Sequence, residues 1–257
     1  MDIREPPGNL PMPLPPSVLA AGVRPRNSLL RLLRAPDYAL LAPSLEPMTK
    51  KSGDLLYNPG DNVEFVYFPC DTSLASYLVS GEDGRDVETV LVGREGAVGG
   101  IVSLGHLPAY CRITIKYGGP FLRLPINKLQ AAKVSTPTLR SVFTRYADCL
   151  LAQMFQSSAC NAIHSIDQRT AKWILAAMDR TGDHLVPLTH EELSTMLGVG
   201  RSYISRVLQT FKADGVLETR RGGLRVLDFD ALTARSCRCN ESIKSHFDTV
   251  LAGAYPA

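Results

Sequence analysis

The chain of 257 residues lacks any apolar run that approaches the roughly 18 residues of a membrane-spanning helix. Its N-terminus is rich in proline and lacks the apolar segment of a secretory signal peptide. A composition of 45% hydrophobic and 21% charged residues is typical of a globular protein in water. We therefore expect a cytoplasmic protein that neither spans nor binds a membrane.

Signals for metal binding and catalysis are also scarce. Six cysteines are spread along the chain without a C-x-x-C pair or the Cys and His spacing of common zinc sites. Cys237 and Cys239 are the one close pair, and nearby residues of one helix point apart, so we expect free thiols, no metal site and no cofactor. Glu191 and Glu192 are adjacent carboxylates, and they also point apart on a helix. The sequence shows no nucleophile–base pair and no phosphate-binding loop. The sequence therefore predicts a protein that is not an enzyme.

The strongest pattern lies between Leu188 and Leu227. Thr189 and Glu192 have the spacing of a capping box, which predicts a helix that begins after this threonine. Gly198 should end that helix, because glycine readily takes the left-handed conformation of a sharp turn. A second helix is expected from about Arg201 to Lys212. Its inward apolar stripe is Ile204, Val207, Leu208 and Phe211.

The outward face of this second helix has hydrogen-bond donors and no carboxylate, a pattern that suits the major groove of DNA. Arginine matches the two acceptors of guanine, and small hydroxyls suit base edges or phosphates. An ordinary amphipathic helix pair with a solvated face is the alternative interpretation. The expected base contacts are Arg201, Ser202, Ser205 and Arg206.

A basic hairpin is expected after the two helices, with strands at residues 216–219 and 224–227. Between Gly200 and Arg225 six Lys or Arg residues oppose two carboxylates, so this segment carries +4, whereas the whole chain carries +3. Helix, turn, helix and hairpin in this order predict a winged helix-turn-helix. The expected phosphate contacts are Thr189, His190, Tyr203, Arg220 and Arg221.

Short β-branched and aromatic stretches, separated by glycine turns, occupy residues 53–124. Their spacing of about ten residues predicts an antiparallel barrel or jelly roll. A helical lead-in is expected at residues 27–41 and is expected to continue towards Met48. The proline-rich residues 1–26 are expected to form a flexible arm or, alternatively, a segment that binds a partner.

A long helix is expected to follow the β region. Thr136 suits its N-cap, Pro137 suits its first turn, and the pattern runs past Cys160. The steps of four and three that pair helices occur at Leu139, Phe143, Tyr146 and Leu150. We expect these four residues to form a dimer interface; the alternative is a helix packed only on its own barrel.

The run LTHEELSTMLGVGRSYISRVLQTFKADGVLE resembles the winged helix-turn-helix of the Crp/Fnr family of bacterial transcription regulators. The segments YNPGD, FVYFP, EDGRDVETVLVGREGAVGG and LRLPINKL resemble that family's sensor domain, which has the cyclic-nucleotide-binding fold. Two positions depart from the pattern: Gly200, where members often have a capping serine, and Ser202, where many have a glutamate. These departures leave the operator sequence open.

The resemblance is weaker at the nucleotide-binding residues. Nucleotide-binding members have Gly-Glu followed by Arg-Ser/Thr-Ala, whereas here Gly99 is followed by Gly100 and Arg112 comes a few residues late. These three residues are the candidate effector pocket. We expect a sensor domain whose effector is lost or different.

The expected fold is α+β, with an N-terminal antiparallel β jelly-roll domain and a C-terminal winged helix-turn-helix. We divide the chain into an arm at 1–26, a sensor domain at 27–135, a dimerisation helix at 136–164 and a DNA-binding domain at 165–257. The resemblance implies a homodimer that binds a pseudo-palindromic site in double-stranded DNA and partners with RNA polymerase. The alternative is a sensor that responds to a cyclic nucleotide or another small molecule.

Overall fold

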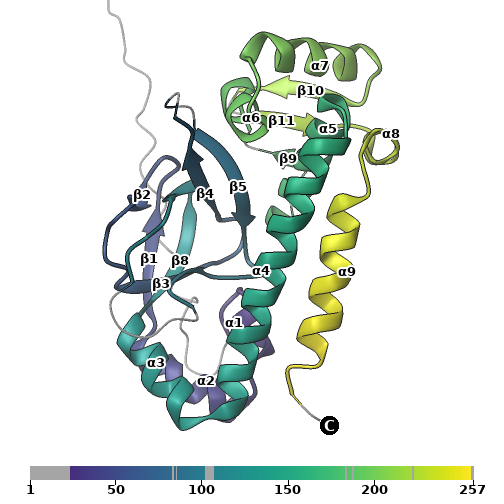
Figure 1. Cartoon of the computed structure of the whole chain (residues 1–257). Helices are drawn as coiled ribbons and strands as arrows, with labels where there is room; N and C mark the ends of the chain where they lie inside the picture. Colours follow the sequence, from purple (N-terminus) through teal and green to yellow (C-terminus); the bar gives the residue numbers. More distant parts are fainter. Residues whose placement is uncertain are drawn as a thin grey trace, which may run out of the picture.

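The computed structural model describes residues 24–255, with the exception of 83, 85, 102–106, 183, 187 and 222. A β domain and a winged helical domain lie on one side of a long helix, α4, and a final helix, α9, runs beside its other side (Figure 1). Most of the arm expected at residues 1–26 lies outside the described residues. No described helix combines the length and the hydropathy needed to cross a bilayer.

Three short helical segments lead into the β domain: α1 (Ser28–Leu32), α2 (Ala35–Leu41) and the 3-10 turn η2 (Ala42–Ser44). Asn27 caps α1 through its side-chain oxygen and is fully buried. Its amide nitrogen also donates to the carbonyls of Pro69 and Gly96, both at 2.8 Å. This asparagine therefore fastens the lead-in helices to the β domain.

Two antiparallel four-stranded sheets form the β domain, which confirms the expected architecture. One sheet has the order β1-β8-β3-β6 and the other has the order β2-β7-β4-β5. The strands are β1 (Glu46–Lys50), β2 (Leu55–Tyr57), β3 (Phe65–Pro69), β4 (Leu74–Ser80), β5 (Asp86–Val92), β6 (Val98–Gly99), β7 (Arg112–Tyr117) and β8 (Gly119–Pro125).

Strand β1 corrects one expectation, because the sequence pattern extended a helix towards Met48. Residues Glu46–Lys50 instead pair with β8, with Met48 opposite Phe121. Pairing with β8 supplies the hydrogen bonds that a helix would have supplied. The core between the sheets holds Ala75, Val90, Val92, Ile113, Ile115 and Phe121.

Helix α3 (Ile126–Ser135) was not expected and precedes the long helix α4 (Pro137–Ile163). Pro137 occupies the first turn of α4, as expected. Thr136 is the N-cap, but its hydroxyl bonds to the carbonyl of Ala132 and makes no capping bond. The hydroxyl of Tyr146, near the middle of α4, bonds to the amide and the carbonyl of Ala97 at 2.9 and 3.0 Å. Helix α4 is thus anchored directly to the β domain.

The winged domain follows after a two-residue break in the helices at His164 and Ser165. Its elements are α5 (Ile166–Thr181), β9 (Leu185–Val186), α6 (His190–Leu197), α7 (Arg201–Ala213), β10 (Leu217–Arg220) and β11 (Gly223–Val226). The three strands pair in the order β10-β11-β9. Trp173 of α5 lies in the core of this domain together with Leu74 and Leu91 of the β domain. The two domains therefore share apolar packing.

The segment after the wing, which holds Cys237 and Cys239, forms two helices in the structure. These are α8 (Phe229–Arg235) and α9 (Cys239–Ala252), separated by residues 236–238, which include Cys237. Cys237 lies in this link and Cys239 is the first residue of α9. The expectation that both cysteines belong to one helix and point apart is therefore wrong.

Candidate nucleic-acid interface

Helix α6 begins as the sequence predicts. The amide of Glu192 donates to the hydroxyl of Thr189 at 3.2 Å, and the amide of Thr189 donates to the carboxylate of Glu192 at 2.7 Å. This reciprocal pair is a capping box, which satisfies two amides at the start of the helix. Leu188 and Leu193 are both buried on either side of the cap, which fixes the angle at which the chain enters α6.

The turn between α6 and α7 depends on Gly198. Its φ of 66° lies in the left-handed region, where a side chain would be strained, and its amide closes α6. Gly200 is the N-cap of α7 and has no side chain to bond the first amides of that helix. The first turn of α7 is thus available to bind an acceptor from outside the chain.

Helix α7 divides into a buried face and an exposed face. Its apolar stripe of Ile204, Val207, Leu208 and Phe211 is buried in the core of the winged domain, as predicted. Arg201, Ser202, Tyr203 and Arg206 are exposed on the other face. The guanidinium of Arg206 lies 5.2 Å from the centre of the Tyr203 ring, which orients both side chains.

Three expected contact residues are engaged with other side chains. His190 Nδ1 and Ser205 Oγ lie 2.9 Å apart, so these two half-buried groups join α6 to α7. Arg201 lies 3.9 Å from the carboxylate of Glu191, and both side chains remain 69% exposed. Since an exposed ion pair is worth little, Arg201 can exchange this partner for another acceptor at small cost.

The two arginines at the tip of the wing, Arg220 and Arg221, differ in whether a carboxylate pairs with them. Arg220 donates to the carboxylate of Glu218 at 2.7 Å, which neutralises much of its charge locally. Arg221 is exposed in the turn and has no ion-pair partner in the part of the chain that the structure describes. Arg221 is therefore the freer cation of the hairpin.

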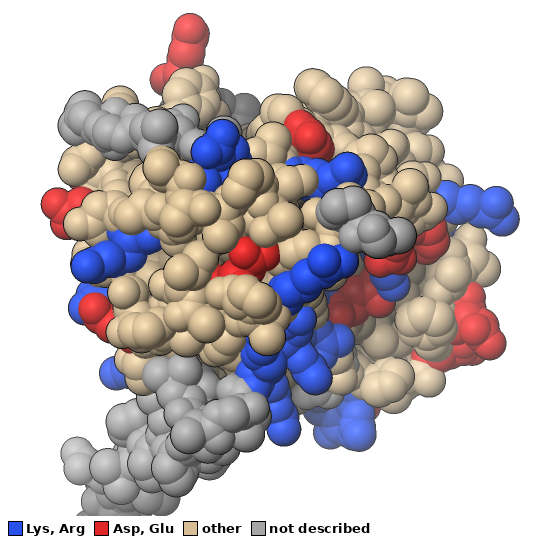
Figure 2. Space-filling view, turned by 90° about the horizontal axis from the view of Figure 1, so that it is seen from below, with Lys and Arg blue, Asp and Glu red and all other residues tan. Residues whose placement is uncertain are grey.

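Basic side chains are not confined to the winged domain. Figure 2 views the end of the molecule opposite α7, where Lys and Arg side chains also gather. Arg31, Arg34, Lys128 and Arg140 are exposed on the helical segments at that end. The density of positive charge alone therefore does not distinguish the α7 end of the molecule from the opposite end.

The residues expected to line an effector pocket are not brought together. Gly99 borders a cavity of about 370 Å³ between the β domain and α4. Gly100 is buried against Ile126 instead. Arg112 bonds to Asp86 at 2.6 Å and does not line the cavity. These three residues therefore do not form a single phosphate-binding site.

The same cavity is unfavourable for an anion. None of the described residues that line it is Lys or Arg, whereas the buried carboxyl of Glu88 does line it. Burial raises the pKa of Glu88, and the ammonium of Lys116, 3.5 Å away, opposes this shift. A site with an acid and mainly apolar walls suits a neutral or cationic small molecule better than a phosphate.

The expected dimer interface on α4 requires a correction. Leu139, Phe143 and Tyr146 are fully buried within a single chain, where they pack on the β domain, α1 and α9. Leu150 is half-buried and lines the cavity. The structure therefore shows the alternative interpretation of the pattern, in which these residues pack inside the subunit. Another face of α4 exposes Leu151, Met154 and Phe155.

The comparisons with known proteins agree with this architecture. Residues 168–235 match the family model described as the Crp-like helix-turn-helix domain. FixK2 from Bradyrhizobium japonicum is 13% identical, covers 75% of this chain and 98% of its own, and superposes with a TM-score of 0.65. A CRP-family transcriptional regulator from Thermus thermophilus is 16% identical over 74% of this chain and 96% of its own, with a TM-score of 0.63.

The c-di-GMP-responsive regulator CLP from Xanthomonas campestris is similar in the same way, at 14% identity, 75% and 99% coverage and a TM-score of 0.61. A comparison with curated proteins finds no match. The fold and the matched domain define a two-part protein with an N-terminal β domain and a C-terminal winged helix-turn-helix. Residues 168–235 thus form a Crp-like helix-turn-helix domain, and the chain as a whole shares the fold of these solved regulators.

Proposed function

We propose that this protein binds a specific, pseudo-palindromic DNA site as a homodimer and regulates transcription from it. The observation that carries the proposal is the face of α7, where Arg201, Ser202, Tyr203 and Arg206 are exposed on a helix whose other face is fully buried. Such a helix can enter a major groove without loss of its own support.

Base recognition is assigned to the arginines of α7. A guanidinium can donate two hydrogen bonds to one guanine, which no other side chain does as well. Ser202 is exposed beside these arginines and is assigned to base edges as well. Ser205 is half-buried and bonded to His190, and we assign its hydroxyl to the same role. Thr189, His190, Tyr203, Arg220 and Arg221 are assigned to phosphates, and Arg221 should contribute most because no described carboxylate neutralises it.

Dimerisation is assigned to the exposed face of α4. Leu151, Met154 and Phe155 are apolar side chains at 38–71% exposure, and Ser158 and Ala162 continue the face with small residues. The positions 151, 155, 158 and 162 alternate in steps of four and three, the spacing of a paired-helix seam. Two copies paired along parallel α4 helices would hold both α7 helices at the same end of the dimer (Figure 1). Half-sites about one helical turn apart would follow from that symmetry.

The test begins with selection of bound fragments from random duplex DNA, which yields the half-site. Arg206→Ala should then weaken operator binding by about 1–3 kcal/mol and relax discrimination at one base pair. Arg221→Ala should weaken binding to all sequences alike and reduce the slope of affinity against salt by about one phosphate contact. Arg31→Ala is the matched control, because it removes the same charge from the opposite end of the molecule. If Arg206→Ala binds the operator as tightly as the control does, α7 is not the reading helix.

A second function, response to a small molecule, is favoured by the cavity beside Gly99. It lies between β strands and α4, so an occupant would contact both the sensor sheets and the helix that leads to the winged domain. Thermal-shift measurements with cyclic AMP and cyclic GMP test the anionic ligands, because a ligand that binds the native state raises the melting temperature. The Glu88 carboxyl leads us to expect no rise with either nucleotide.

A further inference from the structure

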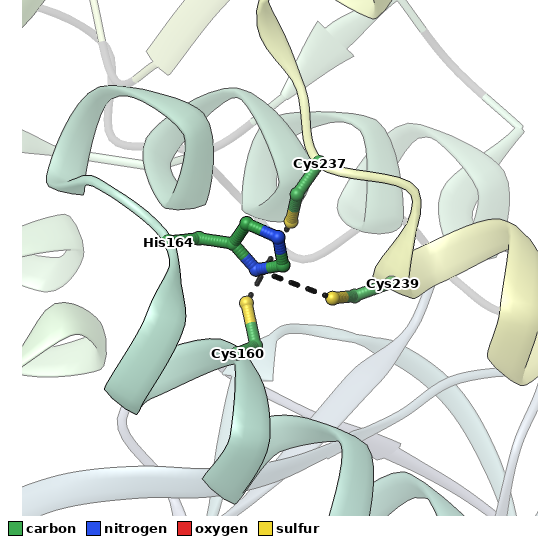
Figure 3. Close-up of side chains that lie close together, drawn as sticks. All are labelled: Cys160, His164, Cys237 and Cys239. Atoms are coloured by element: carbon green, nitrogen blue, oxygen red, sulfur yellow. Dashed lines mark hydrogen bonds between the residues drawn. The ribbon is translucent and has the colours of Figure 1, made fainter.

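Four side chains that commonly bind metals meet between the long helix and the last helix. They are Cys160, His164, Cys237 and Cys239, and their ligand atoms all lie within 4.8 Å of one another (Figure 3). Cys160 belongs to the last turn of α4, and His164 is the residue that ends this helix. Cys237 comes from the link after α8, and Cys239 begins α9. Two segments some 77 residues apart thus supply two ligands each.

Two separations within the set match those around a tetrahedral metal ion, and all the ligand atoms lie within 4.8 Å of one another. Zinc binds thiolate sulfur at about 2.3 Å and imidazole nitrogen at about 2.0–2.1 Å, so tetrahedral angles place two sulfurs about 3.8 Å apart and sulfur and nitrogen about 3.6 Å apart. The sulfurs of Cys160 and Cys237 are 3.6 Å apart. The sulfur of Cys239 is 3.6 Å from Nδ1 of His164. The sulfur–sulfur distance is well beyond the roughly 2.05 Å of a disulfide bond.

The cysteines are buried in a way that core packing does not explain. Cys160, Cys237 and Cys239 are buried at 0–5% exposure, yet they cluster only with one another and not with the aliphatic cores. A buried cysteine that serves as a small apolar residue packs among aliphatic and aromatic side chains, as Cys149 and Cys70 do in this protein. The three thiols and the imidazole instead form a polar pocket of their own.

The surroundings have the charge that a bound ion would require. Three thiolates and one divalent ion leave a net charge of −1, which must be balanced in a buried site. Arg169 and Lys172 of α5 are both buried, and their charges act on the cysteines of this cluster. Nε of Arg169 is buried without a hydrogen-bond partner among the described residues, so it is available to a metal-bound sulfur. Gln156 already donates to the sulfur of Cys239 at 3.1 Å.

We propose that Cys160, His164, Cys237 and Cys239 form a closed, structural zinc-binding site. Four soft or borderline ligands in a compact set favour zinc, because its structural sites are tetrahedral and contain cysteine and histidine. An iron–sulfur cluster spreads its ligands over several irons and fits a set this compact poorly. Cys237 and Cys239 lie beyond the matched helix-turn-helix domain, which ends at residue 235. Cys160 and His164 precede that domain, so all four ligands lie outside it.

The position of the site defines its effect. The chain leaves α4 at His164 and enters α5 two residues later, and this junction connects the sensor to the DNA-binding unit. A metal there would tie the end of α4 to the start of α9 and fix the angle of the junction. We expect loss of the metal to reduce the affinity for the operator. This expectation alone rests on the proposed function.

The test uses the full chain, purified under reducing conditions and dialysed against zinc. We expect about one zinc per chain by elemental analysis. Substitution with Co²⁺ should give the intense visible bands of a tetrahedral ion and the ultraviolet charge-transfer band of a cobalt–thiolate bond. Both signals should be weaker and shifted in Cys237→Ser and unchanged in Cys149→Ala, a matched control that alters a buried cysteine of the same α4 outside the cluster.

A second measurement does not depend on how well a variant folds. Zinc should protect Cys160, Cys237 and Cys239 of the unmodified protein from alkylation, and a chelator should make these three thiols reactive together. The proposal is overturned if the reduced protein takes up no zinc, if the cobalt spectrum of Cys237→Ser equals that of the unmodified protein, or if zinc leaves alkylation unchanged. None of these readouts involves DNA, so they remain decisive even if the protein does not bind an operator.

Discussion

Replacement of Phe155 by glutamate should separate the subunits of the proposed dimer without unfolding either of them. Phe155 is 71% exposed on α4, between Leu151 and Ser158, at the centre of the proposed seam. Since the side chain has few partners inside its own chain, its replacement should change the free energy of unfolding by no more than about 0.5 kcal/mol. In the dimer the same side chain would face its symmetry mate.

The magnitude follows from the exposed area. A phenylalanine side chain has about 200 Å² of surface to bury, so an exposure of 71% leaves roughly 140 Å² available in each subunit. At about 25 cal/mol per Å² this area is worth up to about 3.5 kcal/mol per subunit and about 7 kcal/mol for the pair. Even half of that value raises the dissociation constant of the dimer several hundredfold, since about 1.4 kcal/mol corresponds to a factor of ten.

Sedimentation equilibrium over a range of concentrations measures that constant directly. Phe143→Ala is the matched control, because Phe143 lies on the same helix but is fully buried against the β domain. The control should lose about 3–5 kcal/mol of folding stability, which urea denaturation measures. If Phe155→Glu stays dimeric at the concentrations where the unmodified protein does, the seam lies elsewhere and the reasoning from exposed area is refuted.

Three smaller perturbations test other parts of the structure. Tyr146→Phe should cost about 1–3 kcal/mol in urea denaturation, because it leaves the buried amide and carbonyl of Ala97 unpaired; no loss would mean that this bond is absent. Thr189→Ala should cost about 1 kcal/mol by loss of the cap, and Thr189→Ser should restore most of it; equal stability of the two variants would contradict the capping box. Burial raises the pKa of Glu88 above its ordinary value of 4.5, so the folded state keeps a proton that the unfolded state has lost, and stability falls as the pH rises from about 4.5 through the raised pKa. Glu88→Gln should flatten this decline in denaturation curves at successive pH values, and an unchanged slope would show that Glu88 does not cause it.

The helix-turn-helix was predictable because its signals are local. The reciprocal pair of Thr189 and Glu192 and the left-handed Gly198 act through neighbouring backbone atoms, so the sequence contains the whole of each interaction. The apolar stripe of α7 is equally local in its spacing. The structure places all of these features where the pattern predicts them.

The seam on α4 was not predictable in the same way. Steps of four and three identify an apolar face, and they do not say whether that face meets another subunit or the chain's own β domain. The bonds from Tyr146 to Ala97, 49 residues away, decide the question for this helix. The exposed face around Phe155 contains fewer apolar residues and gave a weaker signal.

The cysteine cluster escaped sequence analysis for a related reason. Its ligands come in two pairs far apart along the chain, and neither pair has a familiar metal-binding spacing. The break between α8 and α9 contains neither glycine nor proline, so nothing in the local pattern separated Cys237 from the helix that follows it. Tertiary contacts with the end of α4 bring the two pairs together.

Leu74 and Leu91 connect the β domain mechanically to the winged domain. Because these two side chains of the sensor sheet sit in the same core as Trp173, a displacement of the sheet cannot stop at the domain boundary. The ion pair between Glu95 and Arg180, 2.9 Å apart, crosses the same boundary. An effector bound in the cavity, as proposed above, would thus act on the winged domain by two routes at once, one along α4 and one directly through shared side chains.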